Sequence, residues 1–182
     1  MSTKDCFEII NKSLEDLFEK LSKYSHKELN IKVYKNKWSI AEHLYHVWLT
    51  EVITIKYIKK KTNYPEYLIN VSFVSKLRMK LLELIFFLGI KMKAPKITYD
   101  SMPQNIEIKK LRETWLKSRK SFEELVNSLD KEILGKGILR HPIVGRINLD
   151  MTLKFINMHF QHHRKIIIKL ESKIKTINGL VC

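Results

Sequence analysis

The chain has 182 residues, 45% of them hydrophobic and 10% aromatic, which excludes a disordered protein and suits one domain spanning residues 1–182. The two cysteines, Cys6 and Cys182, exclude a disulfide framework, and no signal-peptide pattern opens the chain, so we expect a cytoplasmic protein. The formal net charge is +15, but the basic residues are spread over every segment, so nucleic acid is not the expected partner.

A first helix is predicted over residues 2–25. Apolar side chains recur there at spacings of three and four, which is the pattern of a helix with one buried face. Ser2 or Thr3 is expected to cap this helix, because a hydroxyl side chain can accept a hydrogen bond from the first turn. The predicted buried stripe consists of Phe7, Ile10, Leu14, Leu17, Phe18 and Leu21.

A second helix is predicted over residues 38–61. Ser39 stands at its start and Glu42 follows three residues later, which is the spacing of a capping box. The helical pattern then breaks at Pro65, because proline lacks the N–H that a helix interior requires.

An extra apolar segment follows, over residues 71–95. Its apolar run from Leu81 to Ile90 contains Glu83 and is far shorter than the ~20 residues that a membrane span needs, so no membrane span is predicted. A helix packed on the domain or at a dimer contact is favoured. An interfacial basic amphipathic helix is the alternative.

The rest of the chain predicts two more helices. Residues 93–105 contain two prolines and are predicted to be a loop, and residues 106–129 return to a helical pattern. An ordered connection is expected over residues 135–150, and the last helix is predicted to run from an N-cap at Asp150 to about Lys175. Four principal helices, the extra apolar segment and no alternating strand pattern predict an all-α fold, a four-helix bundle.

Three of the seven histidines lie within five positions of the last predicted helix. His159 and His163 are four residues apart and share one face, where two imidazoles can bind one metal ion. His46 of the second helix can complete a three-histidine set, which leaves coordination positions open as in catalytic sites. Glu42, one turn before His46, could accept a hydrogen bond from that ring or act as an acid/base group. Histidines without a ligand role are the alternative, and the pattern alone leaves the two evenly matched.

Three motifs in the same order resemble the DinB-like superfamily, which includes the YfiT-type proteins regarded as metalloenzymes. "WSIAEHLYHV" is similar to the W-[ST]-x-x-E-x-x-x-H helix start of that family, and "HPIVG" to the H-P-x-x-G stretch before its last helix. "HFQHHR" is similar to the H-x-x-H-H run on that last helix. The Gln that usually follows the run is absent, so a different substrate is expected if that Gln binds substrate in relatives. The resemblance covers nearly the whole chain.

This resemblance implies a four-helix bundle with long crossover connections, often a homodimer, with metal ligands at His46, His159 and His163. A divalent ion on three neutral imidazoles, Zn or Ni first and Fe or Cu next, would lower the pKa of bound water towards ~7 and deprotonate a coordinated thiol. The implied activity is S-transfer with a low-molecular-weight thiol such as bacillithiol or mycothiol, or a related hydrolysis, on a small-molecule substrate. A bundle that holds metal or a small ligand without turnover, in a stress response, is the alternative.

Other residues in or beside these motifs have two interpretations each. Trp38 and Trp48 either line the mouth of the site or, as favoured here, pack between helices. His141 is expected to fix its loop by a hydrogen bond rather than to approach the metal. His162 is expected to point away from the ligand face, because it is rotated by about a hundred degrees from its neighbour. Arg164 either binds an acidic substrate or is a solvated surface residue.

Overall fold

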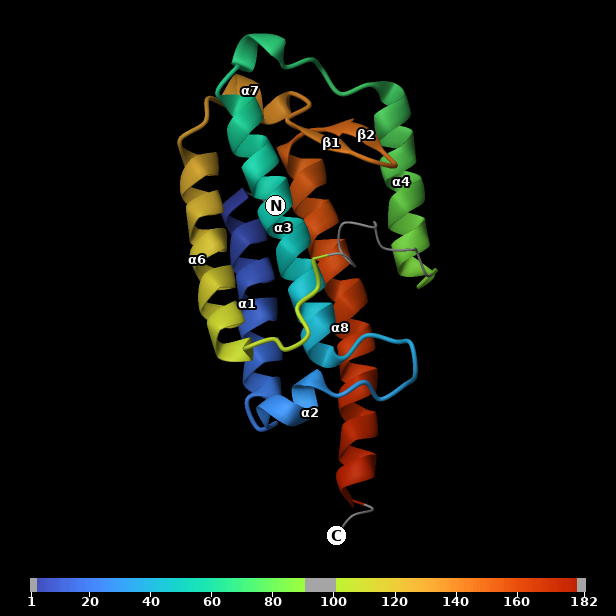
Figure 1. Cartoon of the computed structure of the whole chain (residues 1–182). Helices are drawn as coiled ribbons and strands as arrows, with labels where there is room; N and C mark the ends of the chain where they lie inside the picture. Colours follow the sequence, from blue (N-terminus) through green and yellow to red (C-terminus); the bar gives the residue numbers. More distant parts are fainter. Residues whose placement is uncertain (1–2, 91–100, 180–182) are drawn as a thin grey trace.

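A bundle of four long helices forms the body of the protein (Figure 1). The computed structural model describes residues 3–90 and 101–179. In the bundle α3 packs against α6 and α8, and α1 closes the other side against the same two helices. α1 and α8 run in one direction and α3 and α6 in the other, which confirms the predicted all-α four-helix bundle. The four helices are α1 (Thr3–Leu21), α3 (Ile40–Thr62), α6 (Ile108–Asn127) and α8 (Leu149–Gly179).

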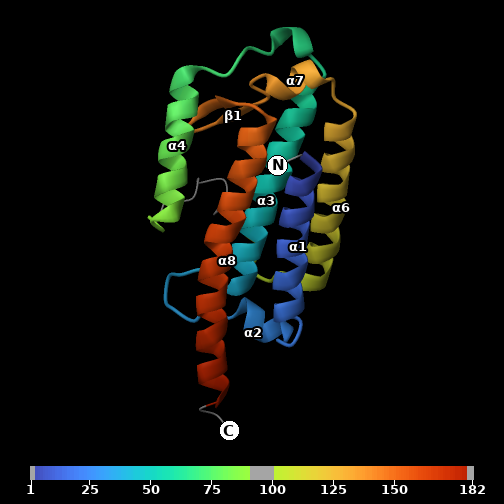
Figure 2. The same cartoon turned by 180° about the vertical axis from the view of Figure 1, so that it is seen from behind.

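Shorter elements connect these helices. α2 (His26–Asn30) lies between α1 and α3. The connection from α3 to α6 contains η1 (Pro65–Tyr67) and α4 (Phe73–Phe87), and it returns the chain to the end of the bundle where α3 began. α4 packs against α8 on the opposite side of the bundle from α6 (Figure 2). It is the extra helix predicted from the apolar segment.

The connection from α6 to α8 contains a hairpin that the sequence analysis did not predict. α7 (Lys131–Gly135) comes first, and β1 (Leu139–His141) then pairs antiparallel with β2 (Gly145–Ile147). Gly145 has a φ of +92°, a left-handed conformation that glycine adopts without strain. Each strand has three residues, which is too short for an alternation of apolar and polar residues to be visible in the sequence.

The start of α3 is as predicted and the start of α8 is not. Glu42 N donates to Ser39 Oγ over 3.1 Å, and Ser39 N donates to Glu42 Oε2 over 2.7 Å, which is the predicted capping box. The predicted N-cap at Asp150 is wrong, because Met151 N donates to Asn148 Oδ1 over 3.0 Å and Asp150 lies in the first turn. Asn148 directly follows β2, so the turn out of the hairpin decides where the helix begins.

The hydrophobic core fills the bundle in two clusters. One lies toward the hairpin and joins residues of α1, α3, α4, α6 and α8. The other lies toward α2 and includes Trp115 and Phe160, whose rings meet edge to face with centroids 6.2 Å apart. The six apolar residues predicted to form the stripe of α1 are all buried. Burial of this stripe is the main physical reason that α1 joins the bundle.

Some predicted features lie wholly or partly beyond the residues that the structure describes. These are the expected cap at Ser2, the end of the apolar segment over residues 71–95, and most of the loop over residues 93–105. Among the described helices, none combines the length and the apolar character that a membrane crossing requires.

Candidate metal centre

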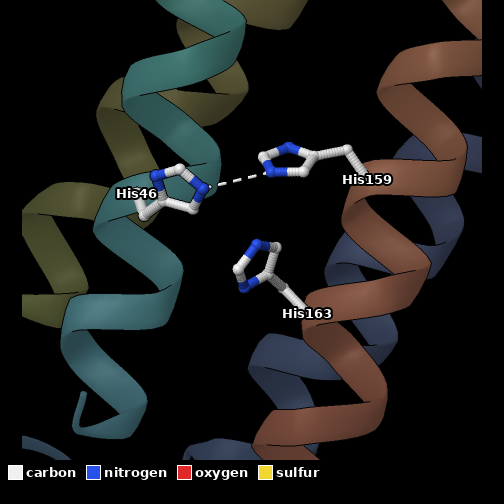
Figure 3. Close-up of side chains that lie close together, drawn as sticks. All are labelled: His46, His159 and His163. Carbon is white, nitrogen blue, oxygen red and sulfur yellow. Dashed lines mark hydrogen bonds between the residues drawn. The ribbon is translucent and has the colours of Figure 1, made fainter. Parts of the chain in front are cut away.

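Three buried histidines from two helices face one another where α3 packs against α8. His46 lies on α3, and His159 and His163 lie one turn apart on α8 (Figure 3). The Nε2 atoms of His46 and His159 are 3.1 Å apart, and one ring nitrogen from each of the three histidines lies within 4.8 Å of the others. The structure therefore brings together the three residues that the sequence predicted as metal ligands.

The donor atoms fit a divalent ion. Two imidazole nitrogens that bind one tetrahedral ion at about 2.0–2.1 Å lie about 3.3 Å apart, close to the distance between His46 and His159. His163 Nδ1 lies 2.9 Å from His43 Nδ1, so Nε2 is the nitrogen that His163 can offer to an ion. His46 Nδ1 is buried and has no hydrogen-bond partner among the described residues. This arrangement fits three imidazoles that bind through Nε2.

The protein keeps the three imidazole rings unprotonated, which metal binding requires. Burial lowers the pKa of His46 to about 4. Burial, reinforced by the neighbouring histidines, lowers the pKa of His159 and of His163 well below the ordinary value of a histidine. At neutral pH all three are therefore uncharged, and each keeps one nitrogen lone pair free for coordination.

Aromatic rings surround the three histidines. Trp38 packs against His46 with centroids 5.0 Å apart, and it stacks on His163 at 6.5 Å. Phe155 stacks on His159 at 5.6 Å with an interplanar angle of 14°, and Phe86 of α4 covers His159 edge to face at 6.3 Å. These contacts restrict ring rotation and exclude water from the back of the site.

His43 is a fourth histidine of the site, and no role for it was predicted from the sequence. If His163 binds an ion through Nε2, its Nδ1 carries the proton and donates it to His43 Nδ1. Burial, together with His46 and His162, lowers the pKa of His43 to about 4, so it is neutral and able to accept. The spacing of three residues between His43 and His46 was the available signal, because such pairs are neighbours on a helix surface.

Replacing His43 is expected to weaken metal binding without abolishing it. In His43→Phe the ring contact with Trp38 can persist, but the hydrogen bond to His163 is lost. Loss of such a partner typically costs 10–100-fold in metal affinity, so we expect Kd for Zn²⁺ to rise by about that factor. Competition with a chromophoric chelator measures the change. His43→Gln, which can still hydrogen-bond, should recover part of the loss, and unchanged affinity in His43→Phe would contradict the role.

The expectation that Glu42 accepts a hydrogen bond from the ring of His46 is wrong, because His46 Nε2 faces His159 and His46 Nδ1 has no partner among the described residues. Glu42 Oε2 accepts from Ser39 N, and Glu42 Oε1 forms an ion pair with Lys32 Nζ at 2.9 Å. Both Glu42 and Trp38 line a pocket of about 360 Å³, so the pocket shares a wall with the metal site. The residues that line it are Lys32, Trp38, Glu42, Met102, Pro103 and Gln104.

The remaining residues of the motifs have different surroundings in the structure. Trp38 both packs against the histidines and lines the pocket, whereas Trp48 packs against Tyr45 with centroids 5.2 Å apart. His162 contacts Phe86 at 5.5 Å and is not one of the three candidate ligands, as its rotation on the helix predicts. Arg164 is partly buried, and within the described part of the chain its Nε has no hydrogen-bond partner.

His141 holds the turn of the hairpin, as expected. Its Nδ1 accepts from the backbone N–H groups of Ile143 and Val144, each over 3.2 Å. Its ring packs edge to face on Phe155, which in turn stacks on His159. His141 therefore supports the wall of the site indirectly.

The metal-free protein is expected to lose stability between about pH 6.5 and pH 4, and His141 should contribute to this loss. Burial lowers its pKa from 6.5 to about 4, so in this range the unfolded chain binds a proton that the folded chain excludes. The free energy of unfolding therefore falls as the pH falls. His141→Asn keeps an acceptor near the position of Nδ1 but cannot titrate. Urea unfolding at pH 7.0, 5.5 and 4.5 should show a shallower pH dependence in the variant, and equal slopes would contradict this.

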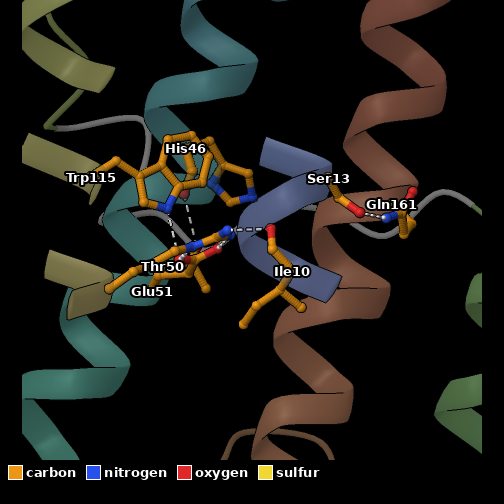
Figure 4. Close-up of polar contacts among 8 residues, drawn as sticks. Ile10, Ser13, His46, Thr50, Glu51, Trp115 and Gln161 are labelled. Carbon is orange, nitrogen blue, oxygen red and sulfur yellow. Dashed lines mark hydrogen bonds and ion pairs between the residues drawn. The ribbon is translucent and has the colours of Figure 1, made fainter. Parts of the chain in front are cut away.

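A buried ion pair anchors the part of α3 that follows His46 (Figure 4). Glu51 accepts from Arg119 Nε at 2.9 Å and from Arg119 Nη2 at 2.8 Å, and its Oε2 also accepts from Trp115 Nε1 at 2.7 Å. Arg119 Nη1 donates to the carbonyl oxygen of Ile10 in α1. These bonds tie α3 to α6 and α1, and so they help to fix the helix that presents His46.

Comparison with known proteins identifies the family of this chain. The chain matches the family model described as the DinB superfamily over residues 8–167. The comparisons with curated proteins and with solved structures gave no match. The match includes α3, α6, the hairpin and the part of α8 that carries His159 and His163. The chain therefore belongs to the DinB superfamily.

Proposed function

We propose that this protein is a metal-dependent enzyme that transfers a low-molecular-weight thiol to a small electrophile, or carries out a related hydrolysis. The observation that carries the proposal is the set of three buried, neutral imidazoles whose nitrogens lie within 4.8 Å of one another beside a pocket. A purely structural ion usually has four protein ligands, whereas three leave a position for substrate. Zn or Ni is the favoured ion, with Fe or Cu next.

Residues of this chain surround the open coordination position and would orient the substrate there. A divalent ion bound there supplies a Lewis acid that lowers the pKa of a thiol or a water molecule. Trp38 offers an apolar wall to the substrate, and Lys32, although paired with Glu42 at 2.9 Å, has further N–H groups that can bind an anionic group on the thiol or its acceptor. Phe86 and Phe155 exclude water from the opposite side of the histidines.

We propose Glu42 as the acid/base group. Support comes from its place on the wall of the pocket and from Lys32, which holds its Oε1 at 2.9 Å. Glu42→Gln is a sharp test, because Gln also serves in a capping box and should preserve the start of α3. We expect kcat to fall by about 10²–10⁴-fold with metal content unchanged. An unchanged kcat would remove Glu42 from the mechanism.

The proposed activity is tested with the metal-loaded protein. Elemental analysis of the purified protein comes first, and we expect close to one divalent ion per chain. The Zn- and Ni-loaded protein is then incubated with a panel of low-molecular-weight thiols and electrophiles, and the loss of free thiol is followed, with His46→Ala as the inactive control. Tight binding of metal and thiol with no turnover on any electrophile would instead support a non-catalytic binding protein.

All three candidate ligands come from one chain, so the site itself requires no second copy. The homodimer and the cytoplasmic location therefore stay predictions that are separate from the chemistry. Light scattering on the purified protein and fractionation of cells test them.

A further inference from the structure

α4 presents a continuous apolar stripe to solvent. The two phenylalanines at its ends are the most exposed, Phe73 at 79% and Phe87 at 81%. All members of the stripe are at least half exposed, which is unusual for so many large apolar side chains on one helix. The stripe consists of Phe73, Val74, Leu77, Leu81, Leu84, Phe87 and Leu88, the last being the residue that caps α4.

This stripe is not needed to hold α4 on the bundle. The residues that α4 buries, Ser75, Met79, Leu82 and Phe86, lie on the opposite side of the helix from Leu77, Leu81 and Leu84. The buried side faces α8 and β2, and Phe86 reaches His159. α4 is therefore apolar on two faces, and packing against the described residues 3–90 and 101–179 accounts for only one of them.

The flanks of the stripe are basic. Lys76 and Lys80 lie along one side of it and Arg78 along the other. α4 has one acidic residue, Glu83, and it is bound by Lys154 of α8 at 2.8 Å and by Lys80 at 3.5 Å. The exposed surface of α4 thus combines an apolar centre with a positively charged rim, on a chain whose formal net charge is +15.

Two partners could cover an apolar stripe of this kind: a second copy of the chain or a lipid surface. The basic rim distinguishes between them. In a two-fold contact between two α4 helices centred near Leu81, Arg78 and Lys80 of both copies would approach one another, and like charges across an interface are costly. An anionic lipid surface presents negative headgroups to the rim and acyl chains to the stripe. A basic helix with Phe and Leu on its other face is the composition of interfacial helices.

We propose that α4 docks this protein onto anionic lipid bilayers. The stripe enters the boundary between headgroups and acyl chains, and Lys76, Arg78 and Lys80 contact the headgroups. Its position allows this, because α4 lies at the outer side of the bundle in both views of the molecule (Figures 1 and 2). The helix lies on the membrane and does not cross it.

Vesicle sedimentation tests the proposal with the full chain. Wild-type protein is mixed with vesicles of phosphatidylcholine alone or with one third phosphatidylglycerol, at low and at high salt. We expect binding to the anionic vesicles that weakens with salt, and at least tenfold weaker binding to phosphatidylcholine. Leu81→Glu/Leu84→Glu should abolish binding. Ile53→Glu, which changes an exposed apolar residue on α3, is the matched control and should bind like the wild type.

The rim is tested separately from the stripe. Removing each basic charge should weaken binding to anionic vesicles about fivefold, so Lys76→Gln/Arg78→Gln should bind roughly 25-fold more weakly at low salt. Circular dichroism and metal content check that every variant is folded. Three results would overturn the proposal: no binding by the wild type, equal binding to both kinds of vesicle, or equal loss in Ile53→Glu. A dimer that Leu81→Glu/Leu84→Glu dissociates, without vesicle binding, would assign the stripe to a second copy instead.

Discussion

Replacing His46 with alanine is expected to abolish stoichiometric binding of a divalent ion. His46 is the ligand that α3 contributes, and without it only the pair on α8 remains. Even the loss of a group that merely supports a ligand costs 10–100-fold in affinity, so loss of a ligand should raise Kd for Zn²⁺ by more than about 100-fold. Elemental analysis after dialysis and chelator competition measure this directly.

The same variant should lose the stabilisation that the ion provides. An ion at 100 times its Kd stabilises the folded state by about 2.7 kcal/mol, which for a chain of this length raises Tm by about 5–11 °C. Calorimetry of the wild type with and without Zn²⁺ should show this rise, and His46→Ala should not. His162→Ala is the matched control, because His162 adjoins His163 and is not one of the three candidate ligands. Retained affinity in His46→Ala, or an equal loss in His162→Ala, would contradict the site.

The pair of candidate ligands on α8 could be predicted from the sequence because its spacing is a local feature, whereas the prediction of His46 also requires that α3 packs beside α8. The spacing of four residues puts His159 and His163 on one face whatever the helix packs against. The capping box at Ser39 and Glu42 fixes where α3 begins and therefore which face carries His46. The capping box follows from local hydrogen-bonding geometry, and the structure confirms it.

Features that depend on lateral packing could not be predicted in this way. The hydrogen bond between His163 and His43 requires a particular rotation and height of α3 relative to α8, which side-chain fit along the whole interface decides. The hairpin before α8 has strands too short to leave a pattern, and its turn moves the helix cap from Asp150 to Asn148. The exposed stripe of α4 was visible as an apolar segment, but which of its faces the bundle covers was not.

Glu51→Gln is expected to cause a large loss of stability. Glu51 and Arg119 are 3% and 2% exposed, so the charge left on Arg119 would be buried without its counter-ion. Removing one partner of such a pair typically costs 3–5 kcal/mol, which corresponds to a fall in Tm of about 6–20 °C for a chain of this size. Urea unfolding followed by circular dichroism measures the change.

Burial explains why this pair should behave differently from the ion pairs on the surface. Glu15 and Arg112 also form an ion pair, but their side chains are 45% and 47% exposed, so Glu15→Gln should cost less than about 1 kcal/mol. Replacing both partners, as in Glu51→Leu/Arg119→Met, should be less harmful than Glu51→Gln alone, because it leaves no unpaired charge in the core. If Glu51→Gln and Glu15→Gln destabilise the protein equally, the pair does not anchor α3 as proposed. If instead the double variant recovers much of the loss, the cost of Glu51→Gln lies in the uncompensated charge of Arg119 and not in lost packing.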